Sequence, residues 1–278
     1  MFGSFRRRCW LTLLVAVIGL NTLTGRAQSV PAMAVLLQHD AVKNAEAARW
    51  EQQLFLSPMG LSADNHAEPG EVSMPRIAAS LVSLAWLGHA PDDSLSLVVE
   101  QDHWIVRWSQ RPASTAVIVM TFDMPPQLLS ELEPLKSAGD GSILLPACMA
   151  LTTGEKIRYE PQAFKNTVGY WVGKHDHCEW KFDVARAGSF NVEVLQGCGT
   201  GQGGSRAKLS VPTIESTAPL EFEVLETGHF QNFQWRHLGT IDITTSGVHS
   251  LKIEPIEIQH AALVDIRAVQ LIPVPSAK

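Results

Sequence analysis

Residues 178–211 read CEWKFDVARAGSFNVEVLQGCGTGQGGSRAKLSV. Apolar and polar residues alternate in WKFDV and again in FNVEV, and the pair Ala187-Gly188 between them supplies a reversal. Successive side chains along a strand point to opposite faces, so each run predicts a strand with one buried face. This stretch therefore indicates a β protein, with two adjoining strands followed by a glycine-rich loop.

The glycine-rich loop, residues 197–204, satisfies the pattern G-x-G-x-x-G. A dinucleotide-binding loop needs a helix directly after its glycines, because the N-terminus of that helix holds the pyrophosphate. Here the alternating run AKLSV follows and predicts another strand, and the Lys-Ser or Lys-Thr pair of a phosphate-binding loop does not follow the glycines. The loop therefore predicts no nucleotide site.

The same strand pattern continues on both sides of this stretch. From residue 142 onward, many short alternating runs are separated by Gly and Pro turns, which predicts a β-sandwich of jelly-roll type over residues 142–278. Four further runs in residues 77–124 predict a small antiparallel β domain. Residues 125–141, which contain three prolines, are expected to link the two regions.

The N-terminal part carries different signals. Residues 32–55 contain no Gly or Pro and show an approximate apolar stripe, so we expect one helix there, followed by a polar linker within the segment 28–76. Three arginines precede a short apolar run, and small residues lead up to Ala27. This is typical of a signal peptide over residues 1–27, and it predicts a secreted or periplasmic protein without a membrane span.

Composition excludes several classes of partner and activity. The net charge is −6, and the 22 Lys and Arg residues form no basic cluster after the signal, which argues against nucleic acid and anionic membranes. Neither a nucleophile motif nor an assignable carboxylate pair for glycoside hydrolysis is recognisable. We therefore expect a protein that is not an enzyme.

Three cysteines follow the signal, at positions 148, 178 and 198. If residues 178–198 formed one hairpin centred near Gly188, Cys178 would face a residue within one position of Cys198, close enough for a disulfide. Two unpaired buried thiols are an equally good interpretation. Cys148 has no obvious partner.

Two clusters are candidates for binding. His175-Asp176-His177-Cys178-Glu179 gathers metal-ligating residue types, although it lacks an established zinc spacing and a solvated loop is the better interpretation. The other cluster combines aromatic rings with amides, as sugar recognition requires, because sugars present apolar C–H faces and hydroxyl edges. Its candidate carbohydrate-binding residues are Tyr170, Trp171, His229, Asn232, Gln234 and Trp235.

The C-terminal sequence resembles a known domain family. The motifs YEP, GYW, VLQGCG-x-GQGGS, TGHFQNF and LVD-x-R-x-V-x-LIP, spread over residues 150–274, are similar to the galactose-binding-like, carbohydrate-binding-module-like β-sandwich of exported bacterial α-L-fucosidase-like glycosidases and sulfatases. More faintly, the runs within residues 83–123 resemble the small β-sandwich that follows the catalytic barrel in such fucosidases.

The resemblance implies a fold and a role. In such a sandwich the glycine-rich loop shapes a rim that a neighbouring backbone or a sugar can approach closely. Related modules often carry a structural calcium ion, and Glu160 and Asp265 occupy the corresponding positions, although the rest of the ligand pattern is incomplete. A catalytic barrel would need several hundred residues ahead of these domains. We therefore expect an exported, non-catalytic accessory protein that binds a glycan or polysaccharide.

The alternative is a protein–protein interaction module that docks on a separate hydrolase or in a surface assembly. Exposed Trp171 and Trp235 rings beside Asn232 and Gln234 would favour sugar, whereas a broad apolar patch would favour a protein partner. A small hydrolase that uses the acidic residues and the His cluster is a third, weaker interpretation.

Overall fold

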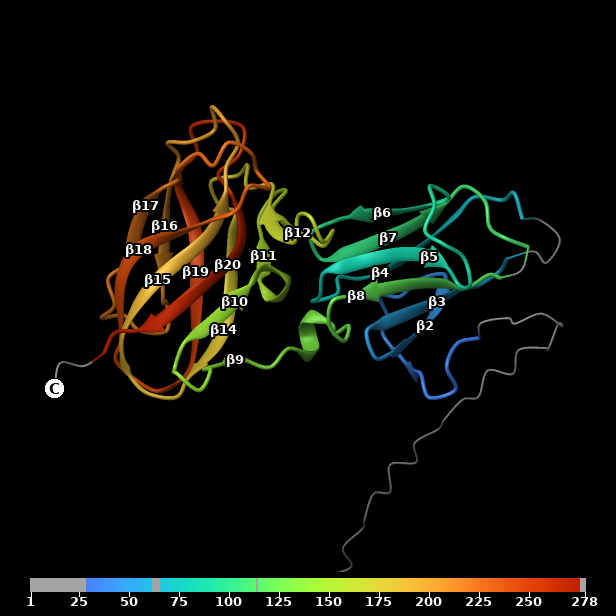
Figure 1. Cartoon of the computed structure of the whole chain (residues 1–278), viewed down its shortest axis with the longest axis horizontal. Coiled ribbons are helices and arrows are strands. Elements are labelled where there is room, and N and C mark those ends of the chain that lie inside the picture. The colour runs from blue at the N-terminus through green and yellow to red at the C-terminus, as the bar shows by residue number, and fades with distance from the viewer. Residues whose placement is uncertain (1–28, 62–65, 114, 276–278) are drawn as a thin grey trace, which may run out of the picture.

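The computed structural model describes residues 29–61, 66–113 and 115–275. Two β-sandwiches lie side by side, the first built from strands between residues 35 and 122 and the second from strands between residues 135 and 273 (Figure 1). The predicted signal peptide lies outside the described residues. Within them, no helix is long and apolar enough to cross a membrane.

The first sandwich pairs a five-stranded sheet, in the order β1-β2-β3-β8-β5, with a three-stranded sheet, in the order β4-β7-β6. All of its strand pairs are antiparallel. The strands are β1 (Val35–Leu36), β2 (Ala45–Trp50), β3 (Gln53–Pro58), β4 (Gly70–Pro75), β5 (Leu81–Trp86), β6 (Leu95–Val99), β7 (His103–Trp108) and β8 (Ile118–Phe122). The four predicted runs in residues 77–124 are confirmed as β5 to β8, although the structure divides them between the two sheets.

The predicted helix over residues 32–55 is wrong, because this segment forms β1, β2 and the first half of β3. Alanine-rich composition favours a helix only weakly, and tertiary packing overrides it. In β2 the side chains of Ala45 and Ala47 are buried while Glu46 is exposed, which is the alternation of a half-buried strand. The predicted linker also contributes β4, which pairs with β7 along its whole length.

Large aromatic side chains fill the space between the two sheets of the first sandwich. Trp104 of β7 stacks on Phe122 of β8 with ring centroids 6.4 Å apart, and Trp86 of β5 meets Trp108 of β7 edge to face at 6.0 Å. Trp86, Trp104 and Phe122 are almost fully buried. Each pair joins one sheet to the other, so these rings bring the two layers together.

The second sandwich consists of two six-stranded sheets. One has the order β12-β13-β20-β15-β18, with β10 also pairing with β20, and the other has the order β11-β14-β19-β16-β17, with β9 parallel to β14. The elements are β9 (Leu135–Lys136), β10 (Ile143–Pro146), β11 (Leu151–Thr153), β12 (Arg158–Glu160), β13 (Thr167–Gly169), β14 (His177–Val184), β15 (Gly188–Gly197), β16 (Arg206–Ser210), β17 (Leu220–Glu223), β18 (Gln234–Ile243), β19 (Gly247–Glu257) and β20 (Asp265–Pro273), with short 3-10 helices η1 (Leu129–Glu131) and η2 (Ala147–Met149).

The proposed disulfide between Cys178 and Cys198 is wrong, because all three described cysteines are free and buried. The hairpin assumption fails, since β14 pairs with β11 and β19 while β15 pairs with β18 and β20. Residues 185–187 therefore carry the chain from one sheet to the other. Cys178 lies in one layer, and Cys198 follows directly after a strand of the opposite layer.

A buried arginine joins the two sandwiches. Arg76 follows β4 of the first sandwich, and its guanidinium donates to the carbonyl of Ala150 at 2.7 Å and to that of Cys148 at 2.8 Å. The guanidinium carbon also lies 4.7 Å from the ring centre of Tyr159. Burial lowers the pKa of Arg76 to about 10. Because the carbonyls belong to and follow η2 of the second sandwich, Arg76 holds the two layered units against each other.

Candidate functional site

The first part of the glycine-rich loop, residues 197–199, is buried against a neighbouring segment, whereas Thr200 and Gly201 are exposed. A side-chain carbon at Gly197 would overlap the carbonyl group of Phe230, and one at Gly199 would lie 3.0 Å from the Phe230 ring. The backbone N–H of Gly201 donates to the Glu226 carboxylate at 2.8 Å. The expected close approach of a neighbouring backbone is confirmed, and a carboxylate already occupies a donor that a phosphate would need.

Beside this loop lies an open pocket with a volume of about 300 Å³. Its charged lining consists of Glu160, Lys165 and Asp265. The remaining lining residues are Tyr170, Val172, Phe230, Gln231, Ala261 and Ala262. The pocket thus combines two aromatic rings with two carboxyl groups, an ammonium group and an amide, all in the second sandwich.

Pairing of short strands brings the charged groups together. Glu160 ends β12, which pairs with β13, and β13 in turn pairs with β20, which begins at Asp265. Gly169, the last residue of β13, lies between the carboxyl groups, because a side-chain carbon there would be 2.7 Å from Asp265 Oδ1 and 3.4 Å from Glu160 Oε2. Lys165 Nζ lies 2.6 Å from Glu160 Oε1. A glycine is therefore needed where the two carboxyl groups converge.

The environment of Asp265 favours its neutral form. Burial and, to a smaller extent, the nearby Glu160 charge raise the pKa of Asp265 to about 8, and Lys165 opposes the rise. The Glu160 carboxyl group pairs with the Lys165 ammonium group. At neutral pH the pocket therefore presents a carboxylic acid that can donate a hydrogen bond beside a carboxylate that can accept one.

Arg267, two residues after Asp265 on β20, fixes the loop that carries Lys165. Its guanidinium donates to the carbonyl oxygen of Lys165 at 2.6 Å and to that of Phe164 at 2.9 Å. The guanidinium carbon lies 3.8 Å from the ring centre of Phe233, which belongs to the same segment as Phe230. One side chain therefore links the lysine loop to the segment that carries the second ring of the pocket.

Tyr170 is held in an unusual conformation at the mouth of the pocket. Its φ of 60° lies in the left-handed region, where a non-glycine residue is strained. The guanidinium of Arg158 lies 3.4 Å from the centre of its ring, and the side chain remains 41% exposed. The arginine therefore orients a half-exposed ring in the way that a flat binding surface requires.

The structure separates the predicted carbohydrate-binding residues. Of these six, only Tyr170 lines the pocket. Trp171 is completely buried, and its indole N–H donates to the Val168 carbonyl at 3.0 Å, so its ring cannot serve as an exposed platform. Asn232 donates its side-chain N–H to the Thr227 carbonyl, which gives this amide a role in holding its own loop.

The other three predicted residues, His229, Gln234 and Trp235, are exposed but do not line the pocket. Gln234 accepts a hydrogen bond from the Arg236 side chain at 3.1 Å. The indole of Trp235 is 43% exposed on β18. The expected patch of Trp171 and Trp235 is therefore not formed, because one of its two rings belongs to the core.

Sequence reasoning missed Phe230 and Gln231 as binding candidates, although both belong to the stretch HFQNFQW that supplied four of the six predicted residues. The residue spacing cannot distinguish which rings of such a stretch face a pocket, because the segment 224–233 is irregular. Lys165 was missed because its role depends on a contact with Glu160 that exists only after β12 and β13 pair.

The histidine-rich cluster has a structural role around Asp176. Its buried carboxylate accepts hydrogen bonds from the backbone N–H groups of Glu155, Val172 and Gly173, at 2.7 to 2.8 Å. His177 Nδ1 contacts the carbonyl oxygen of His175 at 3.0 Å. Across the residues that the structure describes, no group of three His, Cys, Asp or Glu side chains is placed to hold a metal ion.

Glu160 and Asp265 do converge, as the predicted calcium site requires, but the donor set does not fit calcium. Calcium takes six to eight oxygen ligands, whereas here the positive charge beside Glu160 is the Lys165 ammonium group. We derive no role for calcium from these residues.

Comparisons with known proteins find matches among solved structures alone. No family model matches the chain, and no curated protein matches it. A family 35 carbohydrate-binding module from Clostridium thermocellum is similar to this chain, with 12% sequence identity and a TM-score of 0.36, over 48% of this chain and 98% of that module.

Two larger proteins are also similar. The α-L-fucosidase from Vibrio sp. strain EJY3 matches 82% of this chain at 12% identity with a TM-score of 0.35, and the Cry4Aa toxin from Bacillus thuringiensis matches 62% at 12% identity with a TM-score of 0.42. The chain spans 39% of the fucosidase and 27% of the toxin. At these identities and TM-scores no site residue and no role carries over to the present chain.

Proposed function

We propose that the chain is an exported, non-catalytic carbohydrate-binding protein that acts as an accessory to glycan-degrading enzymes. The observation that carries this proposal is the pocket of about 300 Å³ between Tyr170, Phe230 and the Glu160–Asp265 carboxyl groups. Its export follows from the signal pattern in residues 1–27. The fucosidase-like sequence motifs support the accessory role, with a separate hydrolase as the partner.

The chemistry of the pocket suits a sugar ring. Aromatic rings cover the apolar C–H face of a sugar, and paired donors and acceptors bind its hydroxyl edge. Tyr170 and Phe230 supply the rings, the neutral Asp265 supplies a donor, and Glu160 supplies an acceptor. The Lys165 ammonium group, although paired, keeps the pocket from accumulating negative charge.

The test is the affinity of the purified protein for soluble galactomannan, xylan, polygalacturonate and fucoidan, measured by affinity electrophoresis and then by calorimetry with derived oligosaccharides. We expect Phe230→Ala and Tyr170→Ala to weaken binding about tenfold each, which corresponds to about 1.4 kcal/mol. Trp235→Ala is the matched control, because its ring is exposed to a similar degree as that of Tyr170 but does not line the pocket.

Three results would count against the proposal. Failure of the folded protein to bind any of a broad set of glycans would exclude sugar recognition and favour the protein–protein alternative. A loss of affinity in Trp235→Ala alone would move the site away from the pocket. Release of reducing sugar by the wild-type protein, lost in Asp265→Asn, would make the chain a hydrolase.

A further inference from the structure

A second pocket, with a volume of about 500 Å³, lies on the first sandwich, between the turn that joins β2 to β3 and the segment that precedes η1. Trp50 and Glu51 line it on the turn side, and Pro125, Pro126 and Gln127 line it on the other. These residues share none of their positions with the pocket of the second sandwich. Substitutions in one pocket therefore leave the lining of the other unchanged.

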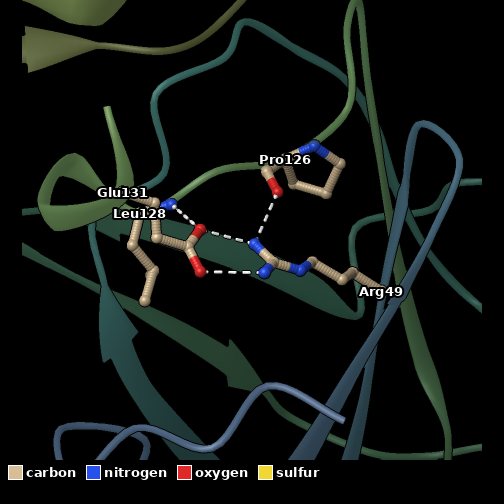
Figure 2. A network of polar contacts seen from close by, with 4 residues as sticks. All are labelled: Arg49, Pro126, Leu128 and Glu131. Carbon is tan, nitrogen blue, oxygen red and sulfur yellow. Dashed lines mark hydrogen bonds and ion pairs between the residues drawn. The ribbon is translucent and has the colours of Figure 1, made fainter. Parts of the chain in front are cut away.

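The Arg49–Glu131 ion pair forms part of the lining of this pocket. Both terminal nitrogens of Arg49 contact the Glu131 carboxylate, at 2.5 and 2.8 Å, and one of them also reaches the Pro126 carbonyl at 3.3 Å (Figure 2). Glu131 additionally accepts the backbone N–H of Leu128 at 3.0 Å (Figure 2). The guanidinium beside it lowers the pKa of Glu131. The two walls are thus tied together before any ligand arrives, which lowers the entropic cost of binding.

The groups left open in the pocket are those that a sugar needs. The Trp50 side chain, 36% exposed, supplies a flat ring. Within the described residues, the side chains of Glu51 and Gln127 make no hydrogen bond or ion pair, and both are exposed. A carboxylate and an amide beside an indole provide an acceptor and a donor–acceptor pair for hydroxyl groups along one ring edge.

The turn that presents Trp50 is strained. Glu51 has a φ of 52°, in the left-handed region that favours glycine. The side-chain amide of the next residue, Gln52, donates to the Asp123 carbonyl at 3.3 Å. A glycine at position 51 would remove the strain but would also remove the carboxylate from the pocket. A strained non-glycine residue at the edge of a pocket is a reason to look for a function there.

We propose that this pocket is a second carbohydrate-binding site, in which Trp50 stacks on a sugar ring and Glu51 and Gln127 bind its hydroxyl groups. The Arg49–Glu131 pair acts as the positioning element, since its charges already satisfy each other and it contributes little net charge for an ionic ligand. Arg49 is the one cationic side chain in the lining and is already paired, and the Glu51 carboxylate would repel an acidic sugar, so the ligand class is a neutral glycan. A proline-rich peptide is the competing occupant, because an indole beside prolines also suits such a chain.

The test reads Trp50 directly. In an NMR spectrum, protein labelled with ¹⁵N-tryptophan gives one indole N–H signal for each tryptophan. The signal that disappears in the Trp50→Phe variant is that of Trp50. The labelled protein is titrated with mannohexaose, xylohexaose, laminarihexaose, cellohexaose and a proline decapeptide. We expect at least one neutral oligosaccharide to move the Trp50 signal, while that of Trp235, which is exposed to a similar degree, stays in place.

Two variants sharpen the assignment. Glu51→Gly keeps and relaxes the turn, and we expect it to weaken binding at this site about tenfold. Phe230→Ala, in the other pocket, should leave the Trp50 titration unchanged, so the two sites fail or succeed separately. The proposal is overturned if no oligosaccharide moves the Trp50 signal, if Trp50 and Trp235 move together, if only the decapeptide acts, or if Glu51→Gly binds as the wild type does.

Discussion

The raised pKa of Asp265 makes the stability of this protein depend on pH in a defined direction. The pKa of Asp265 rises from an ordinary value of 3.8 to about 8, mainly through burial and secondarily through the charge of Glu160. Between these two values the folded protein holds a proton that the unfolded chain has lost. The contribution of Asp265 to the free energy of unfolding is therefore fully present below pH 4 and is lost as the pH rises through about 8.

The magnitude follows from the same values. A rise in pKa of about four units, at about 1.4 kcal/mol for each unit, corresponds to a loss on the order of 5 kcal/mol in the free energy of unfolding between pH 4 and pH 9. Asp265→Asn keeps the shape of the side chain and cannot ionise. We expect the variant and the wild type to be equally stable near pH 4, and the variant to be more stable by several kcal/mol at pH 9, in the direction that this linkage requires.

The assay is urea unfolding followed by tryptophan fluorescence at each pH from 4 to 9, with the difference between variant and wild type plotted against pH. Asp93→Asn serves as the control, because that carboxylate is exposed. Its difference curve should be flat. The reasoning is refuted if the Asp265→Asn curve is also flat, or if the wild type gains stability relative to the variant as the pH rises.

Further predictions concern the junction, the glycine loop, the charged pair and the thiols. Arg76→Met should lower the free energy of unfolding by roughly 3 kcal/mol, because the buried carbonyls of Ala150 and Cys148 lose their donor. Arg76→Lys should be destabilised as well, because an ammonium group does not reproduce the guanidinium contacts, and urea unfolding measures both variants. Gly197→Ala should destabilise the fold by about 2 kcal/mol and weaken glycan binding, because its methyl group displaces Phe230; unchanged binding in that variant would separate the loop from the pocket. Calcium or EDTA should leave the melting temperature unchanged, since Lys165 already neutralises Glu160, and a rise of several degrees with calcium would contradict that role. The three described cysteines, whose burial raises the pKa of each thiol, should react with a thiol reagent only after the protein is unfolded, and fast labelling of the native protein would show that the core opens.

Local patterns in the sequence were sufficient for much of the fold. The alternation in WKFDV and FNVEV identifies β14 and β15, and the same signal identifies β5 to β8, because a half-buried strand repeats every two residues. The close approach of a backbone to the glycine-rich loop was also expected, and it is realised at Gly197 against Phe230. The strand signals depend on residues near in sequence, whereas the glycine run predicts a close approach without naming its partner.

Sheet assignment and the contents of the pockets were decided by the tertiary structure. The segment 32–55 has helical composition, yet pairing with β8 makes β3 a strand, because packing outweighs a weak intrinsic preference. Cys178 and Cys198 stay apart because β14 and β15 join different sheets. Trp171, a predicted binding residue, is buried, whereas Phe230, which was not predicted, lines the pocket. Which ring reaches a pocket depends on contacts between segments distant in the chain, and no local pattern encodes them.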